Sequence, residues 1–302
     1  MADGIELRAA THDDYDAVAA FTRDTWPDRD GGDYIPDVYH DWIDGDDRRT
    51  VVADAGDDVA GIAQGVVLSD WEAWGQGMRV NPDFRGEGIA TAMTHDLFDW
   101  TRSRGARVFR NMVFSWNVGG LGQSRACGYD PATEFRWATP EPDPDATPTL
   151  DVTADPAAAW RYWTASDARE HLSGLALDET ETWALSELTR EKLQRAADDD
   201  GLFVVQDDGT QGVANHVRTY DRESEDGERE TWAEYGVGAW ADATAARSLF
   251  AAVAADAADR GATQTRVLIP ETPRHVSDAA YCRVGIADEP DFVLAADLTR
   301  DH

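Results

Sequence analysis

The stretch that decides the fold of this 302-residue chain is MRVNPDFRGEGIA, residues 78–90. It continues a strand-like segment that begins at Trp71, and Pro82 ends the predicted strand because proline has no N–H for a sheet hydrogen bond. A turn with glycines at positions 86 and 88 follows, and a helix begins within the stretch. We therefore predict a strand, a glycine-containing turn and a helix in succession.

The helix after this turn is predicted over residues 88–104. Its apolar side chains recur at spacings of four, four and three, which places them on one face of the helix. They are Ile89, Met93, Leu97 and Trp100. Gly105 suits the C-terminal end, since glycine readily adopts the left-handed conformation that commonly ends a helix.

The turn before the helix is a candidate anion site. The first N–H groups of a helix point into one concavity, and the helix dipole adds positive potential there. Gly86 and Gly88 let the backbone approach an anion closely. The pattern is neither a Walker motif nor a dinucleotide fingerprint. A diphosphate-binding turn is one interpretation, and a turn that needs glycine only for its geometry is the other.

The elements on either side predict a mixed α/β domain, with a central mixed β-sheet flanked by helices. The predicted strands cover residues 5–8, 50–53, 59–68, 71–80, 108–114 and 134–138. The predicted helices cover residues 11–24, 88–104 and 118–126.

A proline-rich segment divides the chain into two halves. Residues 139–148 contain four prolines, which exclude a helix or a central strand. We predict one domain at residues 1–140, a linker at 141–150 and a second domain at 151–302.

Short segments of the second half resemble the first half. The sequence SRGA at residues 103–106 parallels DRGA at 259–262, an offset of 156, and ACGY at 126–129 parallels RVGI at 283–286, an offset of 157. A nearly constant offset favours an internal duplication. Chance similarity between two α/β domains is the alternative.

Residues 85–90 resemble motif A of the GNAT acetyltransferase superfamily, Gln/Arg-x-x-Gly-x-Gly/Ala. The matching residues are Arg85, Gly88 and Ala90, after a Val-x-Pro match at Val80 and Pro82. A second family feature is an asparagine that opens a helix ending in glycine and an aromatic residue. The matching residues there are Asn117, Gly128 and Tyr129.

The resemblance implies two tandem GNAT-like domains, with acetyl-CoA bound in the first one between two splayed strands. It implies that the pantetheine arm bonds to backbone near Met78 and Val80. It also implies a contact with Asn117, for which an ordinary helix cap is the other interpretation. The pyrophosphate would bind the N–H groups of Arg85, Gly86, Glu87, Gly88, Ile89, Ala90 and Thr91.

The resemblance further implies that a primary amine attacks the thioester directly. An alkylammonium must first lose a proton. Glu72 lies where many relatives place a carboxylate base, and one more acidic surface residue is the alternative. Relatives commonly place a tyrosine acid four residues before the helix-ending glycine. This chain has Ser124 there, which can hydrogen-bond but is a poor acid.

The second half departs from the motif. Its aligned segment ADATAA, residues 241–246, has neither glycine nor arginine, and Asp242 would repel a pyrophosphate. Tyr281 stands four residues before Gly285, where the family places its acid. We predict a non-catalytic copy that packs against the first half and helps to form the acceptor groove.

The composition is strongly acidic. The chain has 59 acidic and 27 basic residues, a net charge of −32, and Lys192 as its only lysine. A cationic partner would explain this charge. Acidic residues spread through both halves favour adaptation to concentrated salt instead, and the composition resembles that of haloarchaeal cytosolic proteins. Nucleic-acid binding is excluded, because it needs basic patches.

Other sequence features predict a cytoplasmic protein that has no membrane-spanning segment and no metal site. No apolar run reaches the roughly 20 residues of a membrane helix, and the N-terminus lacks the features of a signal peptide. Cys127 and Cys282 cannot form a disulfide framework, and the seven histidines show no metal-ligand spacing.

The leading hypothesis is an N-acetyltransferase that acts on a primary amine of a small molecule or an amino acid. The alternatives are an acyltransferase that uses another acyl-CoA, and a CoA-binding sensor or scaffold without turnover. Residues 26–34 carry acids and aromatics that could recognise a cationic amine, or they form a solvated acidic loop. The protein is expected to be a monomer, as a pseudo-dimer of its halves, or a homodimer.

Overall fold

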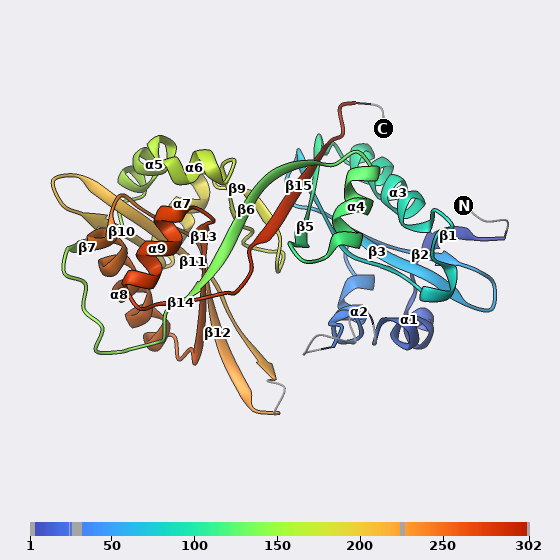
Figure 1. Ribbon diagram of the computed structural model, residues 1–302, viewed down its shortest axis with the longest axis horizontal. Coiled ribbons are helices and arrows are strands. Elements are labelled where there is room, and N and C mark those ends of the chain that lie inside the picture. Colours follow the sequence, from blue (N-terminus) through green and yellow to red (C-terminus); the bar gives the residue numbers. More distant parts are fainter. Residues whose placement is uncertain (1–3, 24, 26–31, 224–226, 301–302) are drawn as a thin grey trace. The chain divides into compact units, whose positions relative to one another are not determined.

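The computed structural model describes residues 4–23, 25, 32–223 and 227–300 (Figure 1). The chain forms two compact units. The first comprises Met1–Val113, Asn117–Pro131 and Val293–His302, and the second comprises Phe114–Trp116 and Ala132–Phe292. The predicted mixed α/β fold, with a sheet flanked by helices, is confirmed.

The first unit is built on a sheet with the order β1-β2-β3-β4-β5-β15. From β1 to β4 the neighbours are antiparallel, whereas β4 and β5 are parallel. The strands are β1 (Glu6–Ala9), β2 (Arg48–Asp54), β3 (Val59–Val67), β4 (Glu72–Val80), β5 (Val108–Phe114) and β15 (Asp291–Asp297). The helices are α1 (Tyr15–Thr22), α2 (Ile35–Ile43), α3 (Ile89–Ser103) and α4 (Val118–Ala126), with short 3-10 turns at His12–Asp14 and Pro82–Phe84.

The second unit repeats this order of elements. Its sheet runs β6-β13-β12-β11-β10-β7, and β12 and β13 are parallel. The strands are β6 (Asp130–Thr139), β7 (Asp151–Thr153), β10 (Leu202–Gln206), β11 (Thr210–Glu223), β12 (Arg229–Trp240) and β13 (Gln264–Pro270), with β14 (Gly285–Ile286) beside β6 and a separate hairpin of β8 (Leu175–Leu177) and β9 (Leu185–Glu187). The helices are α5 (Pro156–Ala165), α6 (Asp167–His171), α7 (Arg190–Asp198), α8 (Ala243–Asp259) and α9 (Pro273–Tyr281).

The two units are not continuous in sequence. Strand β6 begins in the first unit and belongs to the second from Ala132, and β15 begins in the second unit and belongs to the first from Val293. The predicted domains at residues 1–140 and 151–302 treat each domain as one continuous stretch. The contacts instead assign residues 132–140 to the second unit and residues 293–302 to the first.

The long helix of the first unit packs its predicted apolar face onto the sheet. Ile89, Met93 and Leu97 are buried as predicted. Trp100 is only half-buried, and the Arg104 guanidinium lies over its ring at 5.0 Å. Phe98 is buried in its place. The stripe is therefore rotated slightly toward Phe98 relative to the prediction.

Two local predictions near the N-terminus need correction. The predicted helix over residues 11–24 is a 3-10 turn followed by α1, which ends at Thr22, and Asp24 lies outside the described residues. Helix α2 was not predicted. No helix within the described ranges is long and apolar enough to cross a membrane.

Candidate functional site

The backbone at the start of α3 leaves a row of N–H groups without partners. The N-cap is Gly88, with φ +76° and no side chain to cap the helix, and Gly86 has φ +86°. Within the described chain, the N–H groups of residues 86–91 donate no hydrogen bond, and the helical ladder begins with Ala92 N–H to the Gly88 carbonyl, 3.0 Å. The turn is solvent-exposed from Arg85 to Gly88. These groups can therefore bind an anion.

The side chains of this turn leave the amides accessible. A Cβ atom at Gly86 would meet nothing within 4 Å. Arg85 is exposed and forms no ion pair with a described residue. The preceding turn is fixed by Asn81, whose Oδ1 accepts the Asp83 N–H at 3.1 Å. Arg85 is therefore free to contribute its positive charge next to the amides.

Strands β4 and β5 separate beside this turn. Their parallel register runs from Glu72–Val108 to Gly75–Asn111 and stops there, although the strands continue to Val80 and Phe114. Beyond Gly75 the β5-facing edge of β4, including Met78 and Val80, has no strand partner in this register. The predicted splay of the two strands is thus present.

A bulge in β4 accompanies this separation. Gln64 pairs with Gln76, whereas Ile62 pairs with Arg79, so two residues of β4 face one residue of β3. Gly77 lies in the bulge with φ +63°, and a Cβ atom there would come within 2.3 Å of the Trp42 ring. Trp42 of α2 therefore packs directly against the bulge and requires glycine at this position.

Asn111 and Ser124 lie at the closed end of the splay. Asn111 Nδ2 donates to Ser124 Oγ at 3.0 Å, and Ser124 is 1% exposed. Asn111 Oδ1 is buried and accepts no hydrogen bond from a described residue. A buried acceptor without a donor costs about 1–3 kcal/mol. Sequence reasoning missed Asn111, because the strand pattern does not distinguish a functional from a structural amide.

Asn117 caps α4. Its Oδ1 accepts the Gly120 N–H at 2.9 Å, and a Cβ atom at Gly120 would lie 2.7 Å from Asn117 Nδ2. The cap interpretation of Asn117 is therefore confirmed. Its amide nitrogen makes no hydrogen bond to the described part of the chain.

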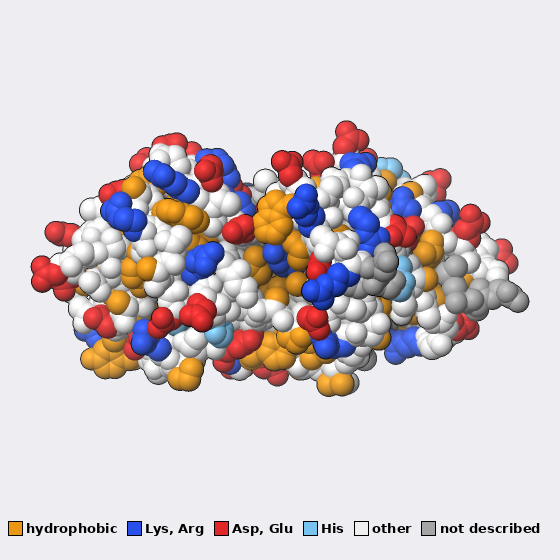
Figure 2. Space-filling model, turned by 90° about the horizontal axis from the view of Figure 1, so that it is seen from above, with side chains coloured by type: hydrophobic (Ala, Val, Ile, Leu, Met, Phe, Trp, Pro, Cys, Tyr) orange, Lys and Arg blue, Asp and Glu red, His pale blue; other side chains and the backbone are white. Residues whose placement is uncertain are grey.

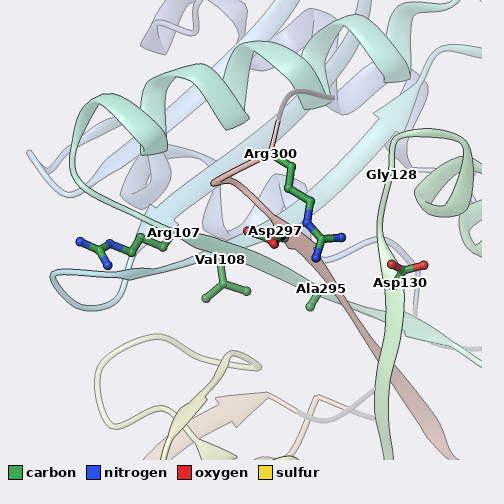
Figure 3. Close-up of a pocket in the computed structure, with 7 residues that line it drawn as sticks. All are labelled: Arg107, Val108, Gly128, Asp130, Ala295, Asp297 and Arg300. Atoms are coloured by element: carbon green, nitrogen blue, oxygen red, sulfur yellow. Dashed lines mark ion pairs between the residues drawn. The ribbon is translucent and has the colours of Figure 1, made fainter.

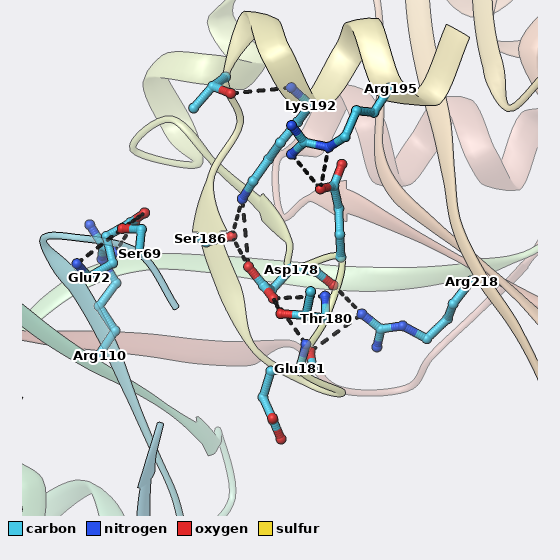
Figure 4. Close-up of polar contacts among 12 residues, drawn as sticks. Ser69, Glu72, Arg110, Asp178, Thr180, Glu181, Ser186, Lys192, Arg195 and Arg218 are labelled. Atoms are coloured by element: carbon cyan, nitrogen blue, oxygen red, sulfur yellow. Dashed lines mark hydrogen bonds and ion pairs between the residues drawn. The ribbon is translucent and has the colours of Figure 1, made fainter. Parts of the chain in front are cut away.

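Glu72 is buried at the start of β4, three residues before the splay. Arg110 Nη1 donates to one carboxylate oxygen at 2.6 Å, and Ser69 Oγ donates to the other at 3.1 Å (Figure 4). The Arg110 guanidinium also lies 5.6 Å from the centre of the Trp71 ring. The interpretation of Glu72 as an acidic surface residue is wrong, since only 3% of it is exposed.

Glu72 and Ser124 belong to opposite faces of the sheet. A Cβ atom at Gly75 would touch the ring of Phe109, and one at Gly65 would touch both Leu97 of α3 and Phe109. Gly75 and Phe109 therefore face α3. Strand alternation places Asn111 on that face, and Glu72 and Arg110 on the other.

The other face also carries a buried ion pair from the segment before α2. Arg79 Nε donates to Asp33 Oδ2 at 2.6 Å, and Arg79 lies 5.6 Å from the centre of the Tyr34 ring. The Asp33 carboxylate is fully buried. Asp33 and Tyr34 end the predicted acceptor segment, whose residues 26–31 lie outside the described residues.

A cavity of about 310 Å³ lies elsewhere in the first unit (Figure 3). It is lined by Arg107, Val108, Gly128, Asp130, Ala295, Asp297 and Arg300. Arg300 and Asp297 form an ion pair at 2.9 Å. The cavity adjoins the start of β5. Gly128 of the second family feature lines it, and none of the predicted catalytic or cofactor-binding residues does.

The start of α8 in the second unit differs sharply from that of α3. Asp242 caps it, with Oδ1 accepting the N–H groups of Thr244 and Ala245, each at 2.9 Å. Trp240 ends β12, as Val80 ends β4, and is 2% exposed. Its indole lies against Phe250 and donates to Asp278 at 3.0 Å.

The prediction that Tyr281 takes the family's acid position is wrong. Gly128, with φ +90°, follows the end of α4 by two residues, and Arg283, with φ +62°, follows the end of α9 by two residues. This aligns Tyr281 with Ala126. The residue at the place of Ser124 is Ala279, which is fully buried, whereas Tyr281 is 65% exposed.

A cluster of polar residues around Asp178 in the second unit is satisfied by its own chain. The Asp178 carboxylate accepts hydrogen bonds from the backbone N–H groups of Thr180 and Glu181, at 2.9 and 3.0 Å (Figure 4). It also accepts one from the Ser186 hydroxyl, and this hydroxyl in turn accepts one from the Lys192 ammonium. These contacts hold the pKa of Asp178 below its ordinary value against the opposing effect of burial. No group of three or more metal-ligating side chains occurs among the described residues.

Comparison with known proteins places these features in context. Residues 15–129 match the model of the "Acetyltransferase (GNAT) family". Two histidine N-acetyltransferases, from Oreochromis niloticus and Scomber australasicus, are 28% and 26% identical to this chain over 102 residues. The match covers 33% of this chain and 29% of each relative.

A solved structure covers nearly the whole chain. The GCN5-related N-acetyltransferase from Sphaerobacter thermophilus superposes with a TM-score of 0.58 at 16% identity, over 99% of this chain and 97% of that one. At this identity the likeness concerns the fold. It extends across both units.

Proposed function

Residues 15–129 belong to the acetyltransferase (GNAT) family, and from this premise we propose that the first unit binds acetyl-CoA and acetylates a primary amine of a small molecule or an amino acid. One observation carries the proposal. The N–H groups of residues 86–91 are unpaired at a helix start that has glycine instead of a capping side chain.

The residues present fit a CoA thioester. The amides of Gly86, Glu87, Gly88, Ile89, Ala90 and Thr91 would hold the diphosphate. The Arg85 N–H, also predicted to bind there, is not free, because this group donates to the Pro82 carbonyl at 3.4 Å, so Arg85 would contribute only its side-chain charge. The free edge of β4 at Met78 and Val80 would bind the amide groups of the pantetheine arm. Asn117, whose amide nitrogen remains available, would donate to the same arm. The unpaired Asn111 Oδ1 is a further sign that a ligand completes this site.

Acetyl-CoA supplies an acyl group activated as a thioester. Glu72 would accept the ammonium proton of the acceptor, directly or through a water molecule, and Arg110 and Ser69 hold its carboxylate in place. Ser124 would act on the departing sulfur from the opposite face of the sheet. Base and leaving group would then not compete for one position.

Two observations support a proposed acceptor class. The curated relatives are named histidine N-acetyltransferases, so we propose that a free amino acid is the first substrate to test. Asp33, Tyr34 and Arg79 line the face of the sheet on which Glu72 lies. A ligand with both an ammonium and a carboxylate suits a wall that carries both charges.

The second unit is proposed to be a non-catalytic copy. The Asp242 carboxylate accepts hydrogen bonds from the first N–H groups of α8, and the buried Trp240 fills the space beside them. We further propose that the protein works in concentrated salt in the cytoplasm. Figure 2 shows Asp and Glu side chains spread over this face of both units, which concentrated salt would screen. It is proposed to be a monomer or a homodimer.

The test combines binding and turnover in molar KCl. Calorimetry should detect one CoA per chain, and a thiol-release assay with acetyl-CoA should respond to an amine such as histidine. Binding without thiol release across a broad amine panel would favour a CoA sensor, which the serine at position 124 makes the second candidate. Turnover only with longer acyl-CoA thioesters would favour another acyl donor. Absence of CoA binding by folded protein would refute the assignment.

A further inference from the structure

Asn111 and Ser124 lie at one end of the splay between β4 and β5, and the unpaired amides of α3 lie at the other. From Gly75, where the register ends, to Val80, where β4 ends, the bulged strand lies against four residue steps of β3, or about 13 Å at 3.3 Å per residue. An extended pantetheine arm is long enough to cover this distance. A CoA molecule with its diphosphate on α3 therefore brings its sulfur to the level of Asn111.

The direction of the hydrogen bond between the two side chains matters. A serine hydroxyl has one proton to donate and two lone pairs that accept. Asn111 Nδ2 occupies one of the lone pairs, at 3.0 Å. Ser124 Oγ donates to no described residue, so its proton is free. Since Ser124 is 1% exposed, bulk water does not compete freely for that proton.

We propose that Asn111 is a positioning residue that turns the Ser124 hydroxyl toward the sulfur of bound CoA. The inference rests on the proposed function and adds an assignment for the leaving group. As the amine nitrogen forms its bond to the acyl carbon, the C–S bond breaks and its electron pair goes to sulfur. Ser124 donates a hydrogen bond to the thiolate and keeps its own proton. Glu72 has taken the ammonium proton before the attack, the nitrogen loses its second proton to water after the bond forms, and the released thiolate takes one from solvent.

The experiment reads the thiol of bound CoA in the absence of turnover. The pKa of that thiol is measured from the difference absorbance of the thiolate, with desulfo-CoA as the blank. In the wild type it should lie about one unit below that of free CoA, because a hydrogen bond to a charged group stabilises the thiolate. Ser124→Ala should abolish this lowering and reduce kcat about tenfold, with KM nearly unchanged.

Asn111→Asp tests the positioning role with an isosteric side chain. A carboxylate only accepts, so Ser124 must donate to it and loses its proton for the sulfur. The thiol pKa should then rise above that of Ser124→Ala. Affinity for desulfo-CoA, which lacks the sulfur, should stay within about twofold if the hydroxyl acts on sulfur alone.

Thr94→Ala is the matched control. Thr94 is buried, and its hydroxyl accepts a hydrogen bond from the side chain of Gln123 at 3.1 Å. Gln123 directly precedes Ser124 in the chain. Thr94→Ala should leave the thiol pKa unchanged. A wild-type thiol that titrates like free CoA, or that Ser124→Ala does not alter, would overturn this inference while CoA binding upholds the proposed site. Failure of the wild type to bind CoA would overturn both. If Asn111→Asp does not fold, Ser124→Ala still tests whether the Ser124 hydroxyl lowers the pKa of the bound thiol, on which the inference depends.

Discussion

The helices α3 and α8 occupy the same place in their units and begin in opposite ways. Each follows a strand whose parallel register with the next strand has already ended, at Gly75–Asn111 in one unit and Tyr235–Val267 in the other. Before α3, an eight-residue turn ends in a glycine with positive φ and leaves amides unpaired. Before α8, two residues suffice, and Asp242 satisfies the amides itself.

This difference shows that the sheet topology alone does not make a ligand site. Both units have the splay, and both have a bulge in the strand before the long helix, at residues 77–78 and near residues 236–237. What separates them is whether the first turn of the helix is satisfied by its own chain. In the first unit these groups remain available, and in the second they contribute to stability.

The largest expected effect comes from making α3 begin as α8 does. Gly88→Asp places a carboxylate at the helix start, where it would cap the amides and face the diphosphate. A carboxylate against the diphosphate is a like-charge contact, which costs several kcal/mol, so CoA affinity should fall about a thousandfold. Calorimetry in molar KCl measures it. Gly88→Asn, which also tolerates positive φ but carries no charge, should lose much less. Equal losses in both variants would show that the cap geometry, and not the charge, decides.

The second largest effect should concern stability and fall in the second unit. Burial raises the pKa of Asp291 to about 6, against the hydrogen bond from the Trp137 indole N–H, 3.1 Å, and the nearby Arg266. The folded state therefore holds the proton more tightly than the unfolded state, whose pKa is 3.8. This stability is fully present below about pH 4 and is lost as pH rises through about 6. A shift of about two units is about 3 kcal/mol.

Urea unfolding between pH 4 and 7 measures this contribution, and Asp291→Asn should remove it. Two histidines, the buried His275 and the half-buried His216, act in the opposite direction. Burial lowers the pKa of His216 and His275 to about 4, so the folded state loses stability as pH falls from about 6.5 toward 4. The variant should therefore reveal a steeper acid loss than the wild type. An unchanged pH profile in the variant would show that Asp291 does not titrate in this range.

A third test uses a pair of similar ion pairs in the two units. Arg110 of β5 pairs in register with Trp74 of β4, and its guanidinium binds Glu72. Arg266 of β13 pairs in register with Glu234 of β12, and its guanidinium binds Glu234. If Glu72 is the base, Glu72→Gln should lower kcat about a hundredfold, or about 2.7 kcal/mol, with CoA affinity nearly unaltered.

Glu234→Gln is the matched control for that prediction. It also breaks a buried glutamate–arginine pair, so it should reduce the free energy of unfolding without changing kcat of the folded enzyme. Full activity of Glu72→Gln, or equal losses of kcat in both variants, would remove Glu72 as the base and leave it a structural residue.

Much of the fold could be predicted because its signals are local. Strand β5 and helix α4 have the predicted limits, and α3 differs by one residue at each end. Helix α2 was missed although Ile35, Tyr39 and Trp42 recur at helical spacing and are all buried. The exchange of β6 and β15 between the units could not be predicted in this way. It depends on which strand edge each segment pairs with, and no local pattern encodes that.

The candidate site was predictable in its backbone and not in its side chains. Gly86 and Gly88 revealed the turn, since positive φ is nearly reserved for glycine. Asn111 could not be predicted as a site residue. Its role depends on the β4–β5 register, which ends at Asn111, and on its hydrogen bond to Ser124 of α4. The alignment of Tyr281 with the acid position failed for a related reason. Glycine at 285 suggested a helix end, but Arg283 adopts the positive φ that ends α9.

The smallest expected effect tests whether the second unit is closed by its cap alone. Asp242→Ala removes two hydrogen bonds at the start of α8, so the free energy of unfolding should fall by about 1 kcal/mol. The amides then become free, as they are at α3, yet CoA stoichiometry should stay at one per chain. Trp240 is still buried against Phe250 where the arm of the ligand would lie. A second bound CoA in calorimetry would show that one carboxylate, and not the packed tryptophan, keeps this unit from binding.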